Sequence, residues 1–323
     1  TAKIDQFSKD NGNKTGSYDA RTKEITWTID VNYNLHDIDN AIVQDFYTGA
    51  ETLVPGALEV RHLNLTSGEN GVSPGALVAG PYDVDDTVKD KDGNSGFKLT
   101  LGKINSAYRI TYKTSLKGQR VGTEYKNHAT LIDEDDPTTL LFNKSVTVSP
   151  KHGNEFINKE GRQGTGAEQD YAFWTVDINL SQSLVEADAK LTDTLSSNQV
   201  LVPDSFKLFA TTVDKDGNPT KSSEAAPSKY TLDVKDNSFA LTFKEAIEES
   251  YVLEYKSFLN ADDGETVTND AKFAGQSSGS AQQSEKSDII VSLSGAGGGA
   301  STPGKGDLTL VKVDASDASK LLE

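Results

Sequence analysis

The chain has 323 residues and a formal net charge of −17, and it contains neither cysteine nor methionine. Its length fits two domains of about 150 residues each better than one β-sandwich. The acidity argues against a nucleic-acid surface, which needs clustered Lys and Arg, and against an anionic membrane. The lack of cysteine excludes disulfides, thiolate zinc sites and cysteine nucleophiles. No run of about 18 apolar residues occurs, so we expect no membrane insertion.

Alternating apolar and polar residues predict half-buried β-strands along the chain. The clearest strands, in chain order, are residues 25–32, 108–114 and 145–149, and turn sequences containing Asp-Gly or Asn-Gly separate such segments. Residues 35–45 and 182–193 could each hold a helical turn or two. The sequence therefore predicts an all-β fold.

The chain also repeats itself. The sequence WTIDVN at 27–32 recurs as WTVDIN at 174–179. Later blocks recur in the same order and at a similar offset: LVP at 53–55 and 201–203, YRITY at 108–112 and YVLEY at 251–255, and Asn-x-Ala at 127–129 and 269–271. Ordered blocks of this kind predict two homologous β domains, with Trp27 and Trp174 at equivalent core positions.

This repeat divides the chain. We expect domain one at residues 1–150 and domain two at residues 151–294. The join between them is short, so the two domains should lie close together. Residues 295–305 have the composition of a Gly-rich linker, and residues 306–323 begin with an alternating strand that is typical of the first strand of a further, truncated domain.

The blocks resemble the collagen-binding-domain repeats of Gram-positive cell-wall adhesins, the group that includes the staphylococcal collagen adhesin. The resemblance rests on Trp-x-x-x-x-Asn, on an apolar-x-Asp before Leu-Val-Pro, and on Tyr-x-(Ile/Leu)-x-Tyr followed by Asn-x-Ala. The tail from residue 306 is similar to the first strand of the stalk domains that follow such repeats. The resemblance implies tandem immunoglobulin-like sandwiches in a secreted, wall-anchored protein. It also implies a host matrix protein as partner, with collagen first, held between the domains near residues 150–156.

The resemblance further implies a self-formed isopeptide bond between a Lys and an Asn in each domain, promoted by an Asp. A buried lysine loses its charge and becomes a nucleophile, and a buried protonated aspartate polarises the asparagine carbonyl. Matching block by block gives two triads: Lys9, Asp45 and Asn127 in domain one, and Lys159, Asp193 and Asn269 in domain two. In domain one, Lys3 and Lys14 remain alternatives to Lys9.

Simpler explanations exist for each residue alone, since a lysine is usually solvated, Asn-x-Ala usually forms a turn, and an aspartate often caps the segment that follows. The four histidines lack metal-site spacing, so no metal or cofactor is expected. Apart from self-cross-linking, no catalytic constellation is present, so we expect a non-enzyme and a monomer. The alternative to an adhesin is a structural spacer that binds no ligand.

Overall fold

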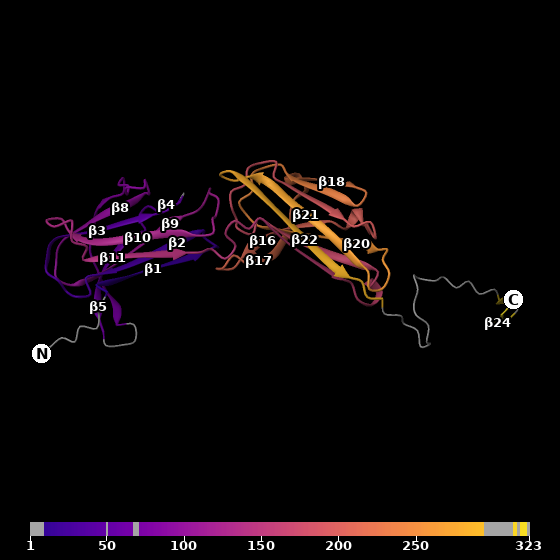
Figure 1. The fold of residues 1–323 in the computed structure, drawn as a ribbon, viewed down its shortest axis with the longest axis horizontal. Coiled ribbons are helices and arrows are strands. Elements are labelled where there is room, and N and C mark those ends of the chain that lie inside the picture. The colour runs from indigo at the N-terminus through magenta and orange to yellow at the C-terminus, as the bar shows by residue number, and fades with distance from the viewer. Residues whose placement is uncertain (1–9, 50, 67–70, 294–312, 315–316, 322–323) are drawn as a thin grey trace.

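The computed structural model describes residues 10–49, 51–66, 71–293, 313–314 and 317–321. Within these residues the chain forms two β-sandwiches that lie end to end (Figure 1). Each sandwich consists of one six-stranded and one five-stranded antiparallel sheet. The prediction of an all-β, tandem fold is confirmed.

The first sandwich contains eleven strands. The six-stranded sheet has the order β1-β2-β9-β5-β6, with β4 beside β9, and the five-stranded sheet has the order β11-β10-β3-β8-β7. The strands are β1 (Gly12–Asp19), β2 (Glu24–Val31), β3 (Ile38–Tyr47), β4 (Thr52–Leu53), β5 (Glu59–Leu65), β6 (Val72–Leu77), β7 (Asp83–Asp85), β8 (Gly96–Ile104), β9 (Ala107–Ser115), β10 (Tyr125–Asp133) and β11 (Phe142–Val148).

The second sandwich repeats this topology strand for strand. Its sheets have the orders β12-β13-β20-β16-β17, with β15 beside β20, and β18-β19-β14-β21-β22. The strands are β12 (Ile157–Gln163), β13 (Tyr171–Ile178), β14 (Lys190–Leu195), β15 (Gln199–Leu201), β16 (Lys207–Val213), β17 (Pro219–Glu224), β18 (Tyr230–Lys235), β19 (Ser238–Phe243), β20 (Tyr251–Leu259), β21 (Thr266–Gln276) and β22 (Ser280–Ile290). Thus β1 corresponds to β12, and each later strand to its counterpart.

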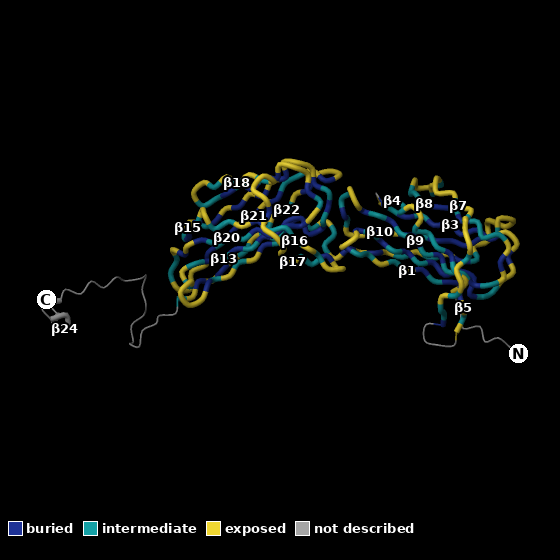
Figure 2. The backbone as a smooth tube through the Cα atoms, turned by 180° about the vertical axis from the view of Figure 1, so that it is seen from behind, coloured by how far each residue is buried: buried dark blue, intermediate teal, exposed yellow. Residues whose placement is uncertain are grey.

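The core of each sandwich lies between its two sheets, and Figure 2 shows buried and more exposed residues alternating along the strands. Trp27 and Trp174 are 0% and 1% exposed, and Ile29 and Val176 are fully buried beside them. These are the inward positions that the alternation predicted. Burial of large aromatic and branched side chains from both sheets is the main force that holds the sheets together.

The asparagine that ends each Trp-x-x-x-x-Asn block has a structural role. Asn32 and Asn179 adopt the left-handed conformation, with φ of 60° and 54°. The Asn32 side chain donates to the carbonyls of His36 and Ser106, and Asn179 donates to those of Ser183 and Glu249. Asparagine tolerates this conformation better than most residues, and its amide here ties the loop after the strand to a neighbouring loop.

The helical turns expected at 35–45 and 182–193 are wrong. Strand β3 occupies most of the first stretch, and β14 begins in the second. Both strands are central in their sheets, so pairing on both sides outweighs the weak local preference. The described residues contain only three short 3-10 turns, Gly166–Glu168, Pro203–Ser205 and Pro227–Lys229, and no helix able to cross a membrane.

At the C-terminal end, β23 (Val313–Asp314) and β24 (Asp317–Leu321) pair as a short hairpin. The linker expected at 295–305 and residues 306–312 of the expected tail strand lie outside the described residues. The further domain at 306–323 therefore stays a prediction.

Candidate functional site

Domain two brings together the three residues of its predicted triad. Lys159 on β12 enters from one sheet, and Asp193 on β14 and Asn269 on β21 enter from the other. Lys159 Nζ lies 2.6 Å from Asp193 Oδ2, and both side chains have 0% exposure. Tyr255 on β20 completes the group, because its Oη donates to Asp193 Oδ2 at 2.8 Å and accepts from Lys159 Nζ at 2.6 Å and Asn269 Nδ2 at 2.8 Å.

Domain one has the same group, with Lys14 as its lysine. Lys14 Nζ on β1 lies 2.5 Å from Asp45 Oδ2 on β3, and both side chains have 0% exposure. Tyr112 on β9 donates to Asp45 Oδ1, and its Oη accepts from Asn127 Nδ2 on β10 at 2.5 Å. Of the lysines that the sequence left open for domain one, Lys14 is the one that occupies the place that Lys159 has in domain two. Lys9 itself lies outside the described residues.

A glycine two residues after each lysine could have identified Lys14. Gly16 pairs with Trp27 across β1 and β2, and Gly161 pairs with Trp174 across β12 and β13. A Cβ added at Gly16 or Gly161 would lie 2.4 or 2.2 Å from the indole ring. The Trp needs a glycine opposite it, so Lys-x-Gly is the pattern that both domains share. Matching the sequence block by block did not use this signal.

Burial controls the charges in both groups. It lowers the pKa of Lys14 and Lys159, although the facing aspartates partly oppose the change. Burial also raises the pKa of Asp45 and Asp193, against the attraction of the lysines. Both shifts favour the neutral amine and the protonated acid, because a buried charge loses its hydration.

Each asparagine presents an unsatisfied carbonyl. Among the described residues, Asn127 Oδ1 and Asn269 Oδ1 are buried without a hydrogen-bond partner, and so is Asp193 Oδ1. Burial raises the pKa of Asp193 more than Asn269 lowers it. A proton on Asp193 would add a donor to a buried group whose carboxylate form carries only acceptors. A neutral amine, a protonated acid and an amide carbonyl are the groups that amide exchange requires.

The described residues hold no cluster of histidine and acidic side chains that could bind a metal. The two Asp-Lys-Asp-Gly-Asn loops are hydrogen-bonded turns. Asp90 accepts the backbone amides of Asp92 and Asn94, and Asp214 accepts those of Asp216 and Asn218.

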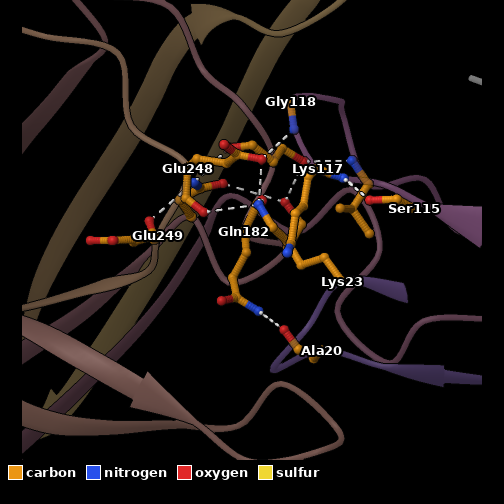
Figure 3. A network of polar contacts seen from close by, with 12 residues as sticks. Ala20, Lys23, Ser115, Lys117, Gly118, Gln182, Glu248 and Glu249 are labelled. Atoms are coloured by element: carbon orange, nitrogen blue, oxygen red, sulfur yellow. Dashed lines mark hydrogen bonds and ion pairs between the residues drawn. The ribbon is translucent and has the colours of Figure 1, made fainter. Parts of the chain in front are cut away.

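The two domains are joined by polar contacts (Figure 3). Lys23, between β1 and β2, extends its ammonium group to Glu248 Oε1 of domain two at 2.5 Å, and that oxygen also accepts the Gly118 amide at 2.5 Å. The Gln182 side chain donates to Ala20 O at 3.0 Å. Backbone bonds cross the junction as well, from Ala20 N to Lys215 O and from Leu184 N to Gln119 O. The expectation that a short join holds the domains close together agrees with these contacts.

Two grooves flank the junction. One, of about 560 Å³, is lined by residues that include Lys23, Lys117 and Glu248. The other, of about 280 Å³, is lined by residues that include Tyr18 and Pro150, at the start of the expected ligand cleft. Phe156, at the end of that segment, is 1% exposed and belongs to the core of domain two.

The repeated topology and the repeated buried group define a tandem pair of β-sandwich domains. The sequence model described as "Collagen binding domain" matches residues 9–139 and again residues 154–284. The chain belongs to this family, in two copies.

Among solved structures, the Enterococcus faecalis surface protein ACE is 16% identical, with 88% of this chain and 95% of that chain covered and a TM-score of 0.37. Its collagen-binding subdomain, ACE19, is 22% identical over 42% of this chain and 96% of that chain, with a TM-score of 0.34. The collagen-binding domain of Erysipelothrix rhusiopathiae surface protein RspB is 14% identical, with 87% and 92% covered and a TM-score of 0.36. No curated protein sequence matches.

Proposed function

We propose that this chain is the matrix-binding segment of a Gram-positive surface adhesin, and that its ligand is collagen. The match of both halves to the collagen-binding domain carries this proposal. Tandem sandwiches joined by a hydrogen-bonded junction suit a protein that holds a fixed ligand under tension. The location is the outer surface of the cell, and the chain acts there as a monomer.

Surface plasmon resonance tests the ligand. The intact chain should bind saturably to immobilised triple-helical collagen. It should bind much more weakly to the same collagen after heat denaturation, because the denatured collagen no longer has the triple helix that the binding surface fits. Size-exclusion chromatography with light scattering tests the monomer. If the chain does not bind native collagen saturably, the result would favour the alternative, a structural spacer. The hydrogen-bonded junction also suits a spacer, because it stiffens the pair of domains.

We propose in addition that each domain cross-links itself, through Lys14 and Asn127 in domain one and through Lys159 and Asn269 in domain two. The neutral lysine Nζ attacks the asparagine Cγ, a C–N bond forms, the Cγ–Nδ2 bond breaks, and ammonia leaves. The protonated Asp45 or Asp193 stabilises the oxygen that gains charge during the attack.

The support for this second proposal is the convergence of a buried amine, acid and carboxamide in both domains. Intact-mass spectrometry tests it, since the chain should be lighter than its sequence by two molecules of ammonia. Peptide mapping should then find the Lys14–Asn127 and Lys159–Asn269 branched peptides. An unmodified mass would contradict the cross-links and would leave the adhesin proposal standing.

A further inference from the structure

The tyrosine in each buried group makes the hydrogen bonds that the proposed triads leave unexplained. Tyr255 Oη is within hydrogen-bond distance of the attacking atom, Lys159 Nζ at 2.6 Å, and of the atom that must leave, Asn269 Nδ2 at 2.8 Å. It also donates to Asp193 at 2.8 Å. In domain one, Tyr112 Oη contacts Asn127 Nδ2 and Asp45. One phenol oxygen thus lies between the reacting nitrogens in domain two and contacts the leaving nitrogen in domain one.

Amide exchange needs a proton at that place. After attack, the lysine nitrogen carries one proton too many, and the Asn nitrogen cannot leave until it gains one. In the cross-linking step proposed above, the protonated aspartate stabilises the oxygen that gains charge, so a further group is needed to bring a proton to the departing nitrogen. Burial raises the pKa of Tyr112 and Tyr255 well above the ordinary value, so both phenols stay protonated. A neutral phenol can accept one proton and give up another without ever carrying a charge.

We propose that Tyr255 and Tyr112 are catalytic residues that relay the proton from the lysine nitrogen to the departing asparagine nitrogen. This inference rests on the proposed cross-links. In domain two, Lys159 Nζ gives its surplus proton to Tyr255 Oη, and Tyr255 gives its own proton to Asn269 Nδ2. The Cγ–Nδ2 bond then breaks and ammonia leaves, so the phenol ends as it began. In domain one the surplus proton of Lys14 reaches Tyr112 through Asp45, which contacts both residues, and Tyr112 gives its own proton to Asn127 Nδ2.

Refolding of the full chain tests this relay. The chain is recovered in denaturant before it has cross-linked and is then refolded for set times. Proteolysis and mass spectrometry quantify the branched peptide of each domain separately. Tyr255→Phe should slow cross-linking of domain two by about 100-fold or more, the usual size of a lost proton-transfer group. Domain one of the same molecule is the internal reference, and Tyr251→Phe removes a buried phenol from the same strand as the matched control.

The solvent isotope effect separates a relay from a purely structural role. Wild-type cross-linking should be slower in heavy water, and the residual reaction of Tyr255→Phe should lose most of that effect. Cross-linking of domain two at the wild-type rate, or slowed cross-linking that keeps the full isotope effect, would overturn the relay. If Tyr255→Phe prevents folding of domain two, Tyr112→Phe gives the same comparison with domain two as reference. A wild-type chain that never loses ammonia would instead remove the cross-link proposal itself.

Discussion

Glu51 gives domain one a buried carboxyl group that domain two lacks. It is 5% exposed, its Oε1 accepts from Thr114 Oγ1 at 2.5 Å, and its Oε2 is buried without a hydrogen-bond partner. Thr114 in turn accepts from the Trp27 indole at 2.9 Å.

In domain two the same chain of contacts runs from Trp174 to Ser257 and ends on Gln199. Gln199 donates to Thr268 O and Ser196 Oγ, so it is fully bonded. We therefore predict that Glu51→Gln stabilises domain one.

The magnitude follows from proton linkage. Burial raises the pKa of Glu51 from 4.5 to about 7, against the hydrogen bond from Thr114 and with help from the nearby charge of Asp45. The folded chain holds this proton more tightly than the unfolded chain, so stability is greatest below pH 4.5 and falls as the pH rises to 7. Above pH 7 the cost of burying the ionised Glu51 is constant, and it lowers the free energy of unfolding by about 3 kcal/mol. Glu51→Gln should recover most of it at pH 8 and change little at pH 4.

Hydrogen-exchange mass spectrometry in increasing urea measures this, because it reports on each domain separately. Wild-type domain one should lose stability between pH 4.5 and 7, and Glu51→Gln should not. The reciprocal variant Gln199→Glu should give domain two the same slope, which makes the two domains controls for each other. If Glu51→Gln destabilises domain one at pH 8, then the interactions of the Glu51 carboxylate outweigh the cost of burying its charge, and the reasoning is refuted.

Three further variants test the packing, the cross-link and the junction. Gly161→Ala places a Cβ 2.2 Å from the Trp174 ring and should cost domain two about 1–3 kcal/mol in urea unfolding. Asp193→Asn should stop ammonia loss in domain two and remove about 4–5 kcal/mol, the chain-entropy value for closing a loop of roughly 110 residues. Glu248→Gln should weaken domain coupling by about 1 kcal/mol and speed amide exchange at the junction, because Lys23 loses its counter-charge. Burial would raise the pKa of Glu248, but its hydrogen bonds hold the pKa below 4.5, so acid below that pH should loosen the wild-type contact too.

Matched variants control these experiments. Gly122→Ala adds a Cβ whose nearest neighbour is 3.6 Å away, so it should be neutral. Asp270→Asn changes the charge of an exposed residue beside Asn269 and should leave the cross-link intact. Asp39→Asn breaks an ion pair with Lys103 whose side chains are 69% and 71% exposed, and it should not affect the junction. An effect of any control equal to that of its partner variant would contradict the corresponding argument.

The repeat made much of the fold predictable. Trp27 and Trp174 stand in blocks whose alternation fixes which residues face the core, and the structure places them there. Asp193, Asn269 and Lys159 could be proposed because both copies keep the same residue types in the same order. Two copies at a similar offset constrain each other in a way that a single strand pattern does not.

Other features depend on contacts that the local sequence does not contain. The choice of Lys14 depends on Gly16 facing Trp27 across two strands, and loop lengths that differ between the copies hid that relation. The contacts of Tyr112 with Asp45 and Asn127 were missed because a tyrosine on an alternating strand has the same pattern as any core residue. The junction is formed by loops whose partners lie in the other domain, such as Lys23 and Glu248.

The position of the proposed bonds determines which strands would carry a load. The lysines lie on the first strand of each sandwich, β1 and β12, and the asparagines lie on the next-to-last, β10 and β21. Tension that enters at β1 would pass through the covalent bond to β10 and then to β11. The β10–β11 ladder joins seven residue pairs in antiparallel register, and β21–β22 joins eleven. The strands between would carry no tension, so a sandwich would stay folded until one of these hairpins opened from the end at which the asparagine lies. The backbone continues this path from β11 into β12, so the two sandwiches, once cross-linked, would bear the load in series.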